Sequence, residues 1–143
     1  MKKGWLILMV ILSACQKQAD KAISEVYLTQ LEGRGSKIGE VIFTDSPQGL
    51  LVQVDLQNLP PGEHGFHIHE NASCAAAEDE SGNLQPAMAA GGHFDPAHTG
   101  KHLGPEGHGH LGDLPALNVT SNGSVKTSFY LPHLDVAEIK NHS

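Results

Sequence analysis

Segments in which apolar and polar residues alternate make up much of the first half of the chain. The alternation is clear over 51–56 and partial over 25–29 and 39–44. A period of two is that of a β-strand with one face against a core. Clusters of glycine, proline and small polar residues separate the segments, at 33–36, 45–49 and 60–62. Such clusters are typical of turns, so we predict short strands joined by tight turns.

The second half contains two further predicted strands and no pattern of a long helix. Residues 116–120 and 125–131 suit strands, with a turn at 121–123 between them, and residues 135–140 suit a single helical turn. Short strands joined by tight turns are typical of antiparallel sandwiches and Greek-key barrels. We therefore predict an all-β fold.

The segment HGFHIH at 64–69 is predicted to be the fourth strand and carries the first candidate chemistry. A period of two sends His67 and His69 to one face, while the apolar residues beside them face the core. Two imidazoles on one face can bind one metal ion, although a surface histidine pair without metal fits this motif equally well. His64, in the turn into the strand, suits hydrogen bonding to a ligand better than binding metal itself.

A loop rich in glycine and histidine, at 91–115, carries a second set of candidate ligands. Its glycines and prolines let distant residues converge. Eight, seven and two residues separate the members of the set, which are His93, His102, His110 and Asp113. Imidazole with carboxylate suits zinc. The alternative is a histidine-rich tract that scavenges metal without fixed spacing, and we leave His98 and His108 out of the ligand set on that ground.

Length and charge narrow the class of protein. The chain has 143 residues, which suits one domain, and a net charge of −7 at pH 7 with histidine neutral. A chain this acidic is not expected to bind nucleic acid.

The first fourteen residues have the pattern of a secretory signal peptide. Two lysines precede an apolar run that is too short to span a membrane and ends in Leu12-Ser13-Ala14-Cys15. This tetrapeptide resembles the bacterial lipobox, so we expect lipid on Cys15, and Gln16 beside it favours the outer membrane. An ordinary leader that is cut near Cys15 is the alternative. We expect a periplasmic protein with three parts, a signal peptide at 1–14, a linker at 15–22 and a folded domain at 23–143.

Taken together, the motifs resemble those of the bacterial copper,zinc superoxide dismutases. The matching segments occur in family order, as GFHIH at 65–69, Cys74, GGHFDP at 91–96, KHLGP at 101–105 and GHLGDLP at 109–115. The resemblance runs from about residue 23 to residue 143. It implies a Greek-key barrel or sandwich. It also implies an oxidoreductase that protects the cell envelope by converting superoxide to oxygen and hydrogen peroxide at a copper centre bridged to zinc.

The resemblance assigns a role to each candidate residue. His67, His69 and His93 would bind copper and act as the catalytic residues. His93 would also bridge to zinc, whose other ligands would be His102, His110 and Asp113. His64 would form a hydrogen bond behind the copper ligands.

The sequence ends at Ser143, where this family continues. The resemblance implies that the last two of its eight strands lie beyond this point, with a further copper histidine, an arginine that attracts the substrate and the cysteine partner of Cys74. We expect His142 to be a solvated terminal residue and not a substitute ligand. The expected result is an open copper site and a barrel with exposed strand edges.

Two functions therefore remain in view, a dismutase and an inactive zinc- and copper-binding lipoprotein remnant of one. A cupin also places His-x-His on a strand, but there the glutamate ligand follows a few residues later, whereas Glu70 follows His69 directly. The oligomeric state, monomer or homodimer, stays open.

Overall fold

The computed structural model describes residues 19–143. The predicted signal peptide, the lipidation site at Cys15 and the first part of the linker lie outside these residues. No helix within 19–143 is long and apolar enough to cross a membrane.

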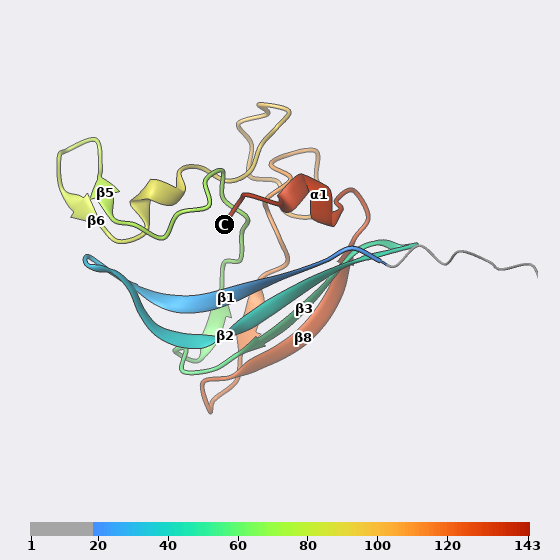
Figure 1. The fold of residues 1–143 in the computed structure, drawn as a ribbon, viewed down its shortest axis with the longest axis horizontal. Helices are drawn as coiled ribbons and strands as arrows, with labels where there is room; N and C mark the ends of the chain where they lie inside the picture. The colour runs from blue at the N-terminus through green and yellow to red at the C-terminus, as the bar shows by residue number, and fades with distance from the viewer. Residues whose placement is uncertain (1–18) are drawn as a thin grey trace, which may run out of the picture.

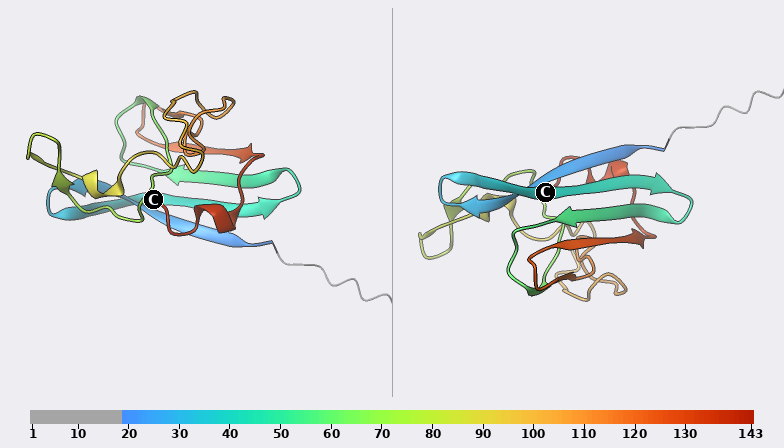
Figure 2. Two further views of the ribbon diagram at one scale, coloured as in Figure 1. Left: turned by 90° about the horizontal axis from the view of Figure 1, so that it is seen from above. Right: turned by 90° about the horizontal axis from the view of Figure 1, so that it is seen from below.

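A four-stranded antiparallel sheet is the largest element of the fold (Figure 1). Its strands stand in the order β1-β2-β3-β8, and their bounds are β1 Lys21–Gln30, β2 Gly33–Ser46, β3 Gly49–Leu56 and β8 Val125–Leu131. The predicted strands over this region are confirmed, and β1 and β2 extend beyond the predicted bounds. The first turn is shorter than the predicted 33–36, because Gly33 and Arg34 already pair with Gln30 and Thr29. Figure 2 shows the four strands side by side.

The remaining elements are short and lie on one side of this sheet, with the long loops and the helix above it in Figure 1. Strand β4 (Gly62–His64) pairs with β7 (Leu117–Val119), and β5 (Ala77–Glu78) pairs with β6 (Leu84–Gln85). A 3₁₀ turn, η1, covers Met88–Ala90. The predicted helical turn is confirmed as α1 (Val136–Ile139), where Asp135 and Glu138 form a capping box.

The core lies between the large sheet and these shorter elements. Alternate residues of β3 are buried, and Leu50 and Val52 are both 0% exposed. Ile68, Leu117 and other residues of the second layer pack against them. Each fully buried side chain of this kind contributes about 1.5–3 kcal/mol. The all-β sandwich is thus confirmed, whereas no strand pairing within 19–143 joins the two layers into a closed barrel.

The predicted fourth strand differs from a regular strand. Strand β4 ends at His64, and beyond it only two isolated bridges occur, His67 with Asp113 and His69 with His93. The segment pairs with the histidine-rich loop, and this loop does not provide a straight partner strand. The predicted separation of side chains still holds, because Ile68 is buried in the core while the histidines on either side of it face the loop.

Candidate metal centre

A closed ring of backbone hydrogen bonds brings three distant segments together. Ile68 N donates to Gly112 O at 2.9 Å, Gly112 N donates to Phe94 O at 2.9 Å, and Phe94 N donates to Ile68 O at 2.8 Å. Each of the three residues is next to a candidate ligand, with His67 and His69 flanking Ile68, His93 preceding Phe94 and Asp113 following Gly112. The backbone therefore places the candidate ligands before any side-chain contact is considered.

The four predicted zinc ligands converge. One ligand atom from each of His93, His102, His110 and Asp113 lies within 4.8 Å of the others. The three histidines all face Asp113 Oδ1 through Nδ1, at 2.7 Å for His93 and at 3.8 Å for both His102 and His110. Three nitrogens around one carboxylate oxygen form the mixed ligand set that zinc prefers.

Unpaired buried atoms show that this cluster suits a metal ion. Among the described residues, His110 Nδ1, Asp113 Oδ2 and His67 Nδ1 are buried and have no hydrogen-bond partner. Leaving a buried polar atom unpaired costs about 1–3 kcal/mol. A cation bound here would engage His110 and Asp113, two cluster residues with buried atoms that have no protein partner, so the donor set fits zinc in chemistry and position.

The two strand histidines flank the other side of the His93 ring. The ring of His67 stacks on that of His93 with centroids 3.9 Å apart, and the ring of His69 lies edge-on at 5.2 Å. His69 Nδ1 is 3.0 Å from the carbonyl oxygen of Gly91, which can only accept, so Nδ1 carries the hydrogen and Nε2 keeps its lone pair. Three imidazoles with available nitrogens suit copper.

Charge and burial act together on the ionisable groups of the centre. Burial alone would raise the pKa of the Asp113 carboxyl, but the hydrogen bond from His93 and the nearby imidazoles hold this pKa below its ordinary value. Burial, followed by charge on His93, lowers the pKa of His67. Both effects favour the forms that bind metal, an ionised carboxylate and a neutral imidazole.

The other predicted residues lie outside the ligand cluster. His64 Nε2 donates to the carbonyl oxygen of Pro60 at 2.7 Å, so in this structure it contacts backbone and no candidate ligand. His98 and His108 are exposed loop residues. Cys74 is exposed and forms no disulfide with a described residue.

The expectation that His142 is a solvated terminal residue is wrong. Its side chain is half-buried, its ring lies 4.3 Å from that of Phe94, and Nδ1 donates to Glu70 O at 2.7 Å. The cause is backbone pairing, because Ser143 and His69 exchange hydrogen bonds and hold the last residues against the centre.

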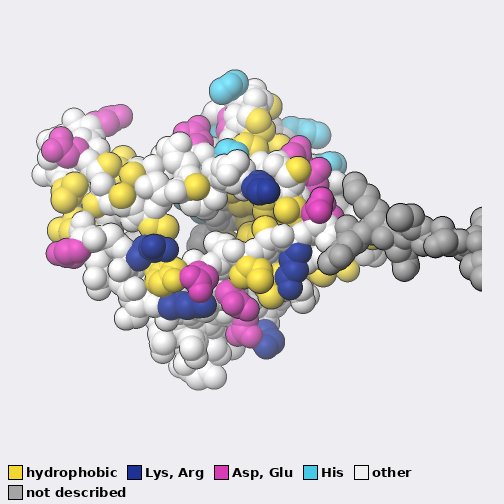
Figure 3. Space-filling view, viewed as in Figure 1, with side chains coloured by type: hydrophobic (Ala, Val, Ile, Leu, Met, Phe, Trp, Pro, Cys, Tyr) yellow, Lys and Arg dark blue, Asp and Glu magenta, His cyan; other side chains and the backbone are white. Residues whose placement is uncertain are grey.

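An apolar pocket of about 410 Å³ lies beside the candidate copper ligand His67. His67 and Cys74 line it together with β1 residues such as Val26 and with Ile139 of α1. Figure 3 shows the surface hollowed between β1 and the loops above it, with histidines gathered over the upper loops.

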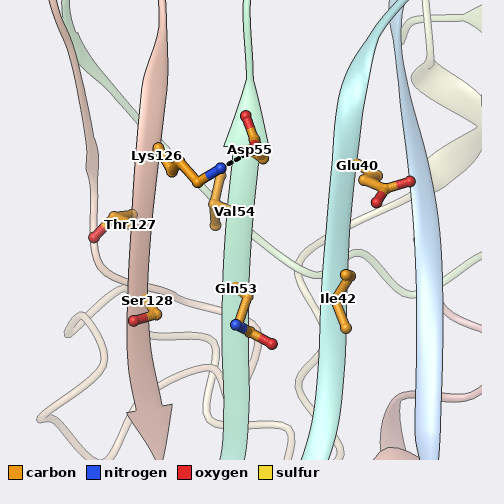
Figure 4. Close-up of a pocket in the computed structure, with 8 residues that line it drawn as sticks. All are labelled: Glu40, Ile42, Gln53, Val54, Asp55, Lys126, Thr127 and Ser128. Atoms are coloured by element: carbon orange, nitrogen blue, oxygen red, sulfur yellow. Dashed lines mark hydrogen bonds and ion pairs between the residues drawn. The ribbon is translucent and has the colours of Figure 1, made fainter.

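A second pocket lies on the large sheet, between β2, β3 and β8 (Figure 4). It is lined by residues such as Gln53 and by the Asp55–Lys126 ion pair, and it includes none of the candidate ligands.

The fold is an antiparallel β-sandwich, and histidines and an aspartate converge between its strand and loop segments. This combination is that of a β-sandwich metalloprotein.

Residues 37–143 match the family model described as copper/zinc superoxide dismutase. The superoxide dismutase [Cu-Zn] of Brucella abortus is 43% identical over 144 residues, covering 100% of this chain and 83% of that protein. The protein of that name from Escherichia coli K12 is 45% identical over 142 residues, covering 99% of this chain and 82% of its own length.

Solved structures agree with this assignment. The Brucella abortus Cu/Zn superoxide dismutase superposes with a TM-score of 0.82 at 46% identity, covering 85% of this chain and 79% of that chain. The monomeric copper, zinc superoxide dismutase from Salmonella enterica gives a TM-score of 0.75 at 44% identity, covering 86% and 80%. The chain belongs to the copper/zinc superoxide dismutase family, a family of oxidoreductases that bind copper and zinc.

Sequence reasoning missed two parts of the centre. One is the backbone ring through Gly112, for which a glycine between two motif residues is the only signal. The other is Asp95, whose carboxylate faces His110 at 3.7 Å from outside the ligand cluster. Its signal is an aspartate followed by Thr99 and Gly100, a combination typical of a side chain that organises a turn.

Proposed function

We propose that this chain converts superoxide to oxygen and hydrogen peroxide at a copper ion that His93 bridges to zinc. The position of His93 carries the proposal. Its Nδ1 lies 2.7 Å from Asp113 within the zinc cluster, while its ring contacts those of His67 and His69 on the other side. One imidazole therefore belongs to two neighbouring ligand sets.

Two groups of residues have separate tasks in this proposal. His93, His102, His110 and Asp113 hold zinc, which has no redox chemistry and fixes the bridging ring. His67, His69 and His93 hold copper. Copper bound there would supply the one-electron chemistry by which one superoxide is oxidised to oxygen and a second, with two protons, is reduced to hydrogen peroxide.

The bridging histidine, His93, also binds and releases a proton in this proposal. With Nδ1 of His93 beside Asp113, Nε2 is the ring nitrogen that would carry a proton during the reaction. The nearby carboxylate of Asp113 fixes the ring while this exchange takes place. Electron transfer and proton delivery are thereby coupled at one ring. His64 anchors the backbone before the copper ligands through Pro60.

The decisive experiment measures dismutase activity per bound copper in the full chain loaded with both metals. A dismutase keeps its activity when EDTA is added to suppress catalysis by free copper. A protein that only stores metal, the alternative function, holds copper and zinc yet consumes no superoxide under these conditions. The variant His93→Ala should lose both bridging and activity, and unchanged content of both metals in this variant would refute the ligand assignment.

Export and anchoring are the cellular part of the proposal. The leader at 1–14 and Cys15 would place the protein in the periplasm with lipid in the outer membrane. There it would remove superoxide from the cell envelope. The linker is shorter than the predicted 15–22, because β1 of the folded domain begins at Lys21. Labelling with a radioactive fatty acid should mark the unaltered protein and not Cys15→Ala, and equal labelling of the two would refute lipidation.

Sedimentation of the purified protein distinguishes monomer from homodimer.

A further inference from the structure

We propose that Asp95 orients His110 for zinc as a carboxylate partner on the far side of its ring, an inference that rests on the proposed zinc site. His110 stands between two carboxylates. Its Nδ1 lies 3.8 Å from Asp113 Oδ1, and its Nε2 lies 3.7 Å from Asp95 Oδ2. Asp113 belongs to the ligand cluster, whereas Asp95 does not.

The pair is shielded from water. The side chains of His110 and Asp95 are 9% and 11% exposed, whereas that of His102 is 68% exposed. Electrostatic attraction between imidazole and carboxylate is stronger in such surroundings than in water. A carboxylate accepts hydrogen and has none to give, so Asp95 favours the form of His110 that carries hydrogen on Nε2. This form leaves the lone pair on Nδ1, the buried nitrogen that faces Asp113 and has no hydrogen-bond partner among the described residues.

Asp95 is itself held in place by the turn that follows it. The Thr99 hydroxyl donates to its two oxygens at 3.2 and 3.3 Å, and Gly100 N donates to Oδ2 at 2.9 Å. Its carbonyl oxygen also accepts from His98 N at 2.9 Å. The carboxylate is therefore fixed before metal binds, as a residue that positions a ligand must be.

The same turn leads directly to the next zinc ligand. Gly100 has a φ of +61°, which turns the chain toward Lys101 and His102. Lys101 O accepts a hydrogen bond from His110 N at 2.9 Å. Asp95 thus connects the ring of His110 with the backbone that precedes His102, although it lies outside the ligand cluster. It is a positioning residue, and its loss should weaken zinc binding more than folding.

The test measures zinc affinity in the copper-free full chain by competition with a chelator of known affinity. Asp95→Asn keeps the size of the side chain and removes its charge, and we expect a dissociation constant about 10- to 100-fold higher. The control is Thr99→Val, which removes the hydroxyl that holds Asp95 but leaves the carboxylate facing His110, and its effect should be several-fold smaller. With cobalt in place of zinc, Asp95→Asn should shift the visible absorption bands, because the ligand ring changes orientation.

A second measurement needs no variant. Nitrogen NMR of the zinc-loaded chain should show hydrogen on Nε2 of His110 and metal on Nδ1, and the reverse assignment would overturn the inference. So would zinc affinity and cobalt spectra that are the same in Asp95→Asn as in the unaltered chain. In both cases the unaltered chain still binds zinc, so the proposed function survives. If the unaltered chain takes up no zinc, the proposed function and this inference fail together.

Discussion

Gly112 approaches the backbone of Ile68 so closely that a β-carbon added at Gly112 would lie 2.2 Å from the Ile68 carbonyl oxygen. The same β-carbon would lie 2.8 Å from Phe94 N. Both neighbours belong to the ring of backbone hydrogen bonds that gathers the candidate ligands. Because the clashing atoms are backbone, no side-chain rotation can relieve the contact.

We therefore predict that Gly112→Ala destabilises the metal-free chain by about 1–3 kcal/mol, the usual cost of forcing extra volume into a packed site. The opened ring should also weaken zinc binding, since Asp113 is the next residue. Urea unfolding and chelator competition measure the two effects. Gly92→Ala is the matched control, because its β-carbon would meet only Glu70 side-chain atoms at 3.7 Å or more. Equal stability of the two variants would contradict this prediction.

Gly65 illustrates a different constraint, which acts on a side chain. A β-carbon at Gly65 would lie 2.9 Å from His67 Nε2. The ring of His67 can move away at little cost to the fold, so Gly65→Ala should change stability by less than about 1 kcal/mol. Displacing this ring from its stack on His93 should nevertheless lower copper affinity and alter the electron paramagnetic resonance spectrum of bound copper(II). An unchanged spectrum with full copper content would show that the ring position is not needed.

The sequence indicated the strands better than it indicated how the site is assembled. Alternation over 51–56 marks β3 because each buried residue of this strand meets the same core. The segment 64–69 alternates equally well, yet regular pairing stops at His64 since its later partners are loop residues. The alternation of apolar and polar residues predicts which face of a strand is buried. Which segment pairs with that strand depends on how a distant loop folds.

The convergence of His93, His102, His110 and Asp113 could be predicted from residue types and spacing, but the orientation of the histidine rings could not. Which ring nitrogen faces the centre depends on contacts such as that of His69 Nδ1 with Gly91 O, which joins residues far apart in sequence. The contact of Asp95 with His110 is of the same kind. His142 escaped prediction for a similar reason, because its burial results from the pairing of Ser143 with His69.

Zinc binding should stabilise the fold through the ligand histidines, and the other histidines of the loop should not contribute. A metal that binds only the folded chain adds about 2.7 kcal/mol at a free concentration 100 times its dissociation constant. His110→Ala should lose most of this gain, because it removes a buried ligand. His98→Ala and His108→Ala, at exposed loop positions outside the cluster, should retain it. Thermal unfolding with and without zinc measures the difference, and equal losses in all three variants would favour the scavenging-tract interpretation.

Burial of His67 should make the stability of the metal-free chain depend on pH. Desolvation, together with charge on His93, lowers the pKa of His67 in the folded chain below its ordinary value of 6.5. As the pH falls through 6.5, the unfolded chain takes up a proton that the folded chain does not, so the free energy of unfolding should decrease until the lower folded pKa is reached. Above 6.5 both states are neutral at this residue and the contribution is constant. His67→Gln should flatten this part of the profile in urea unfolding series, whereas His98→Gln, which removes an exposed histidine, should leave the slope in place. A slope that persists unchanged in His67→Gln would assign the effect to other groups.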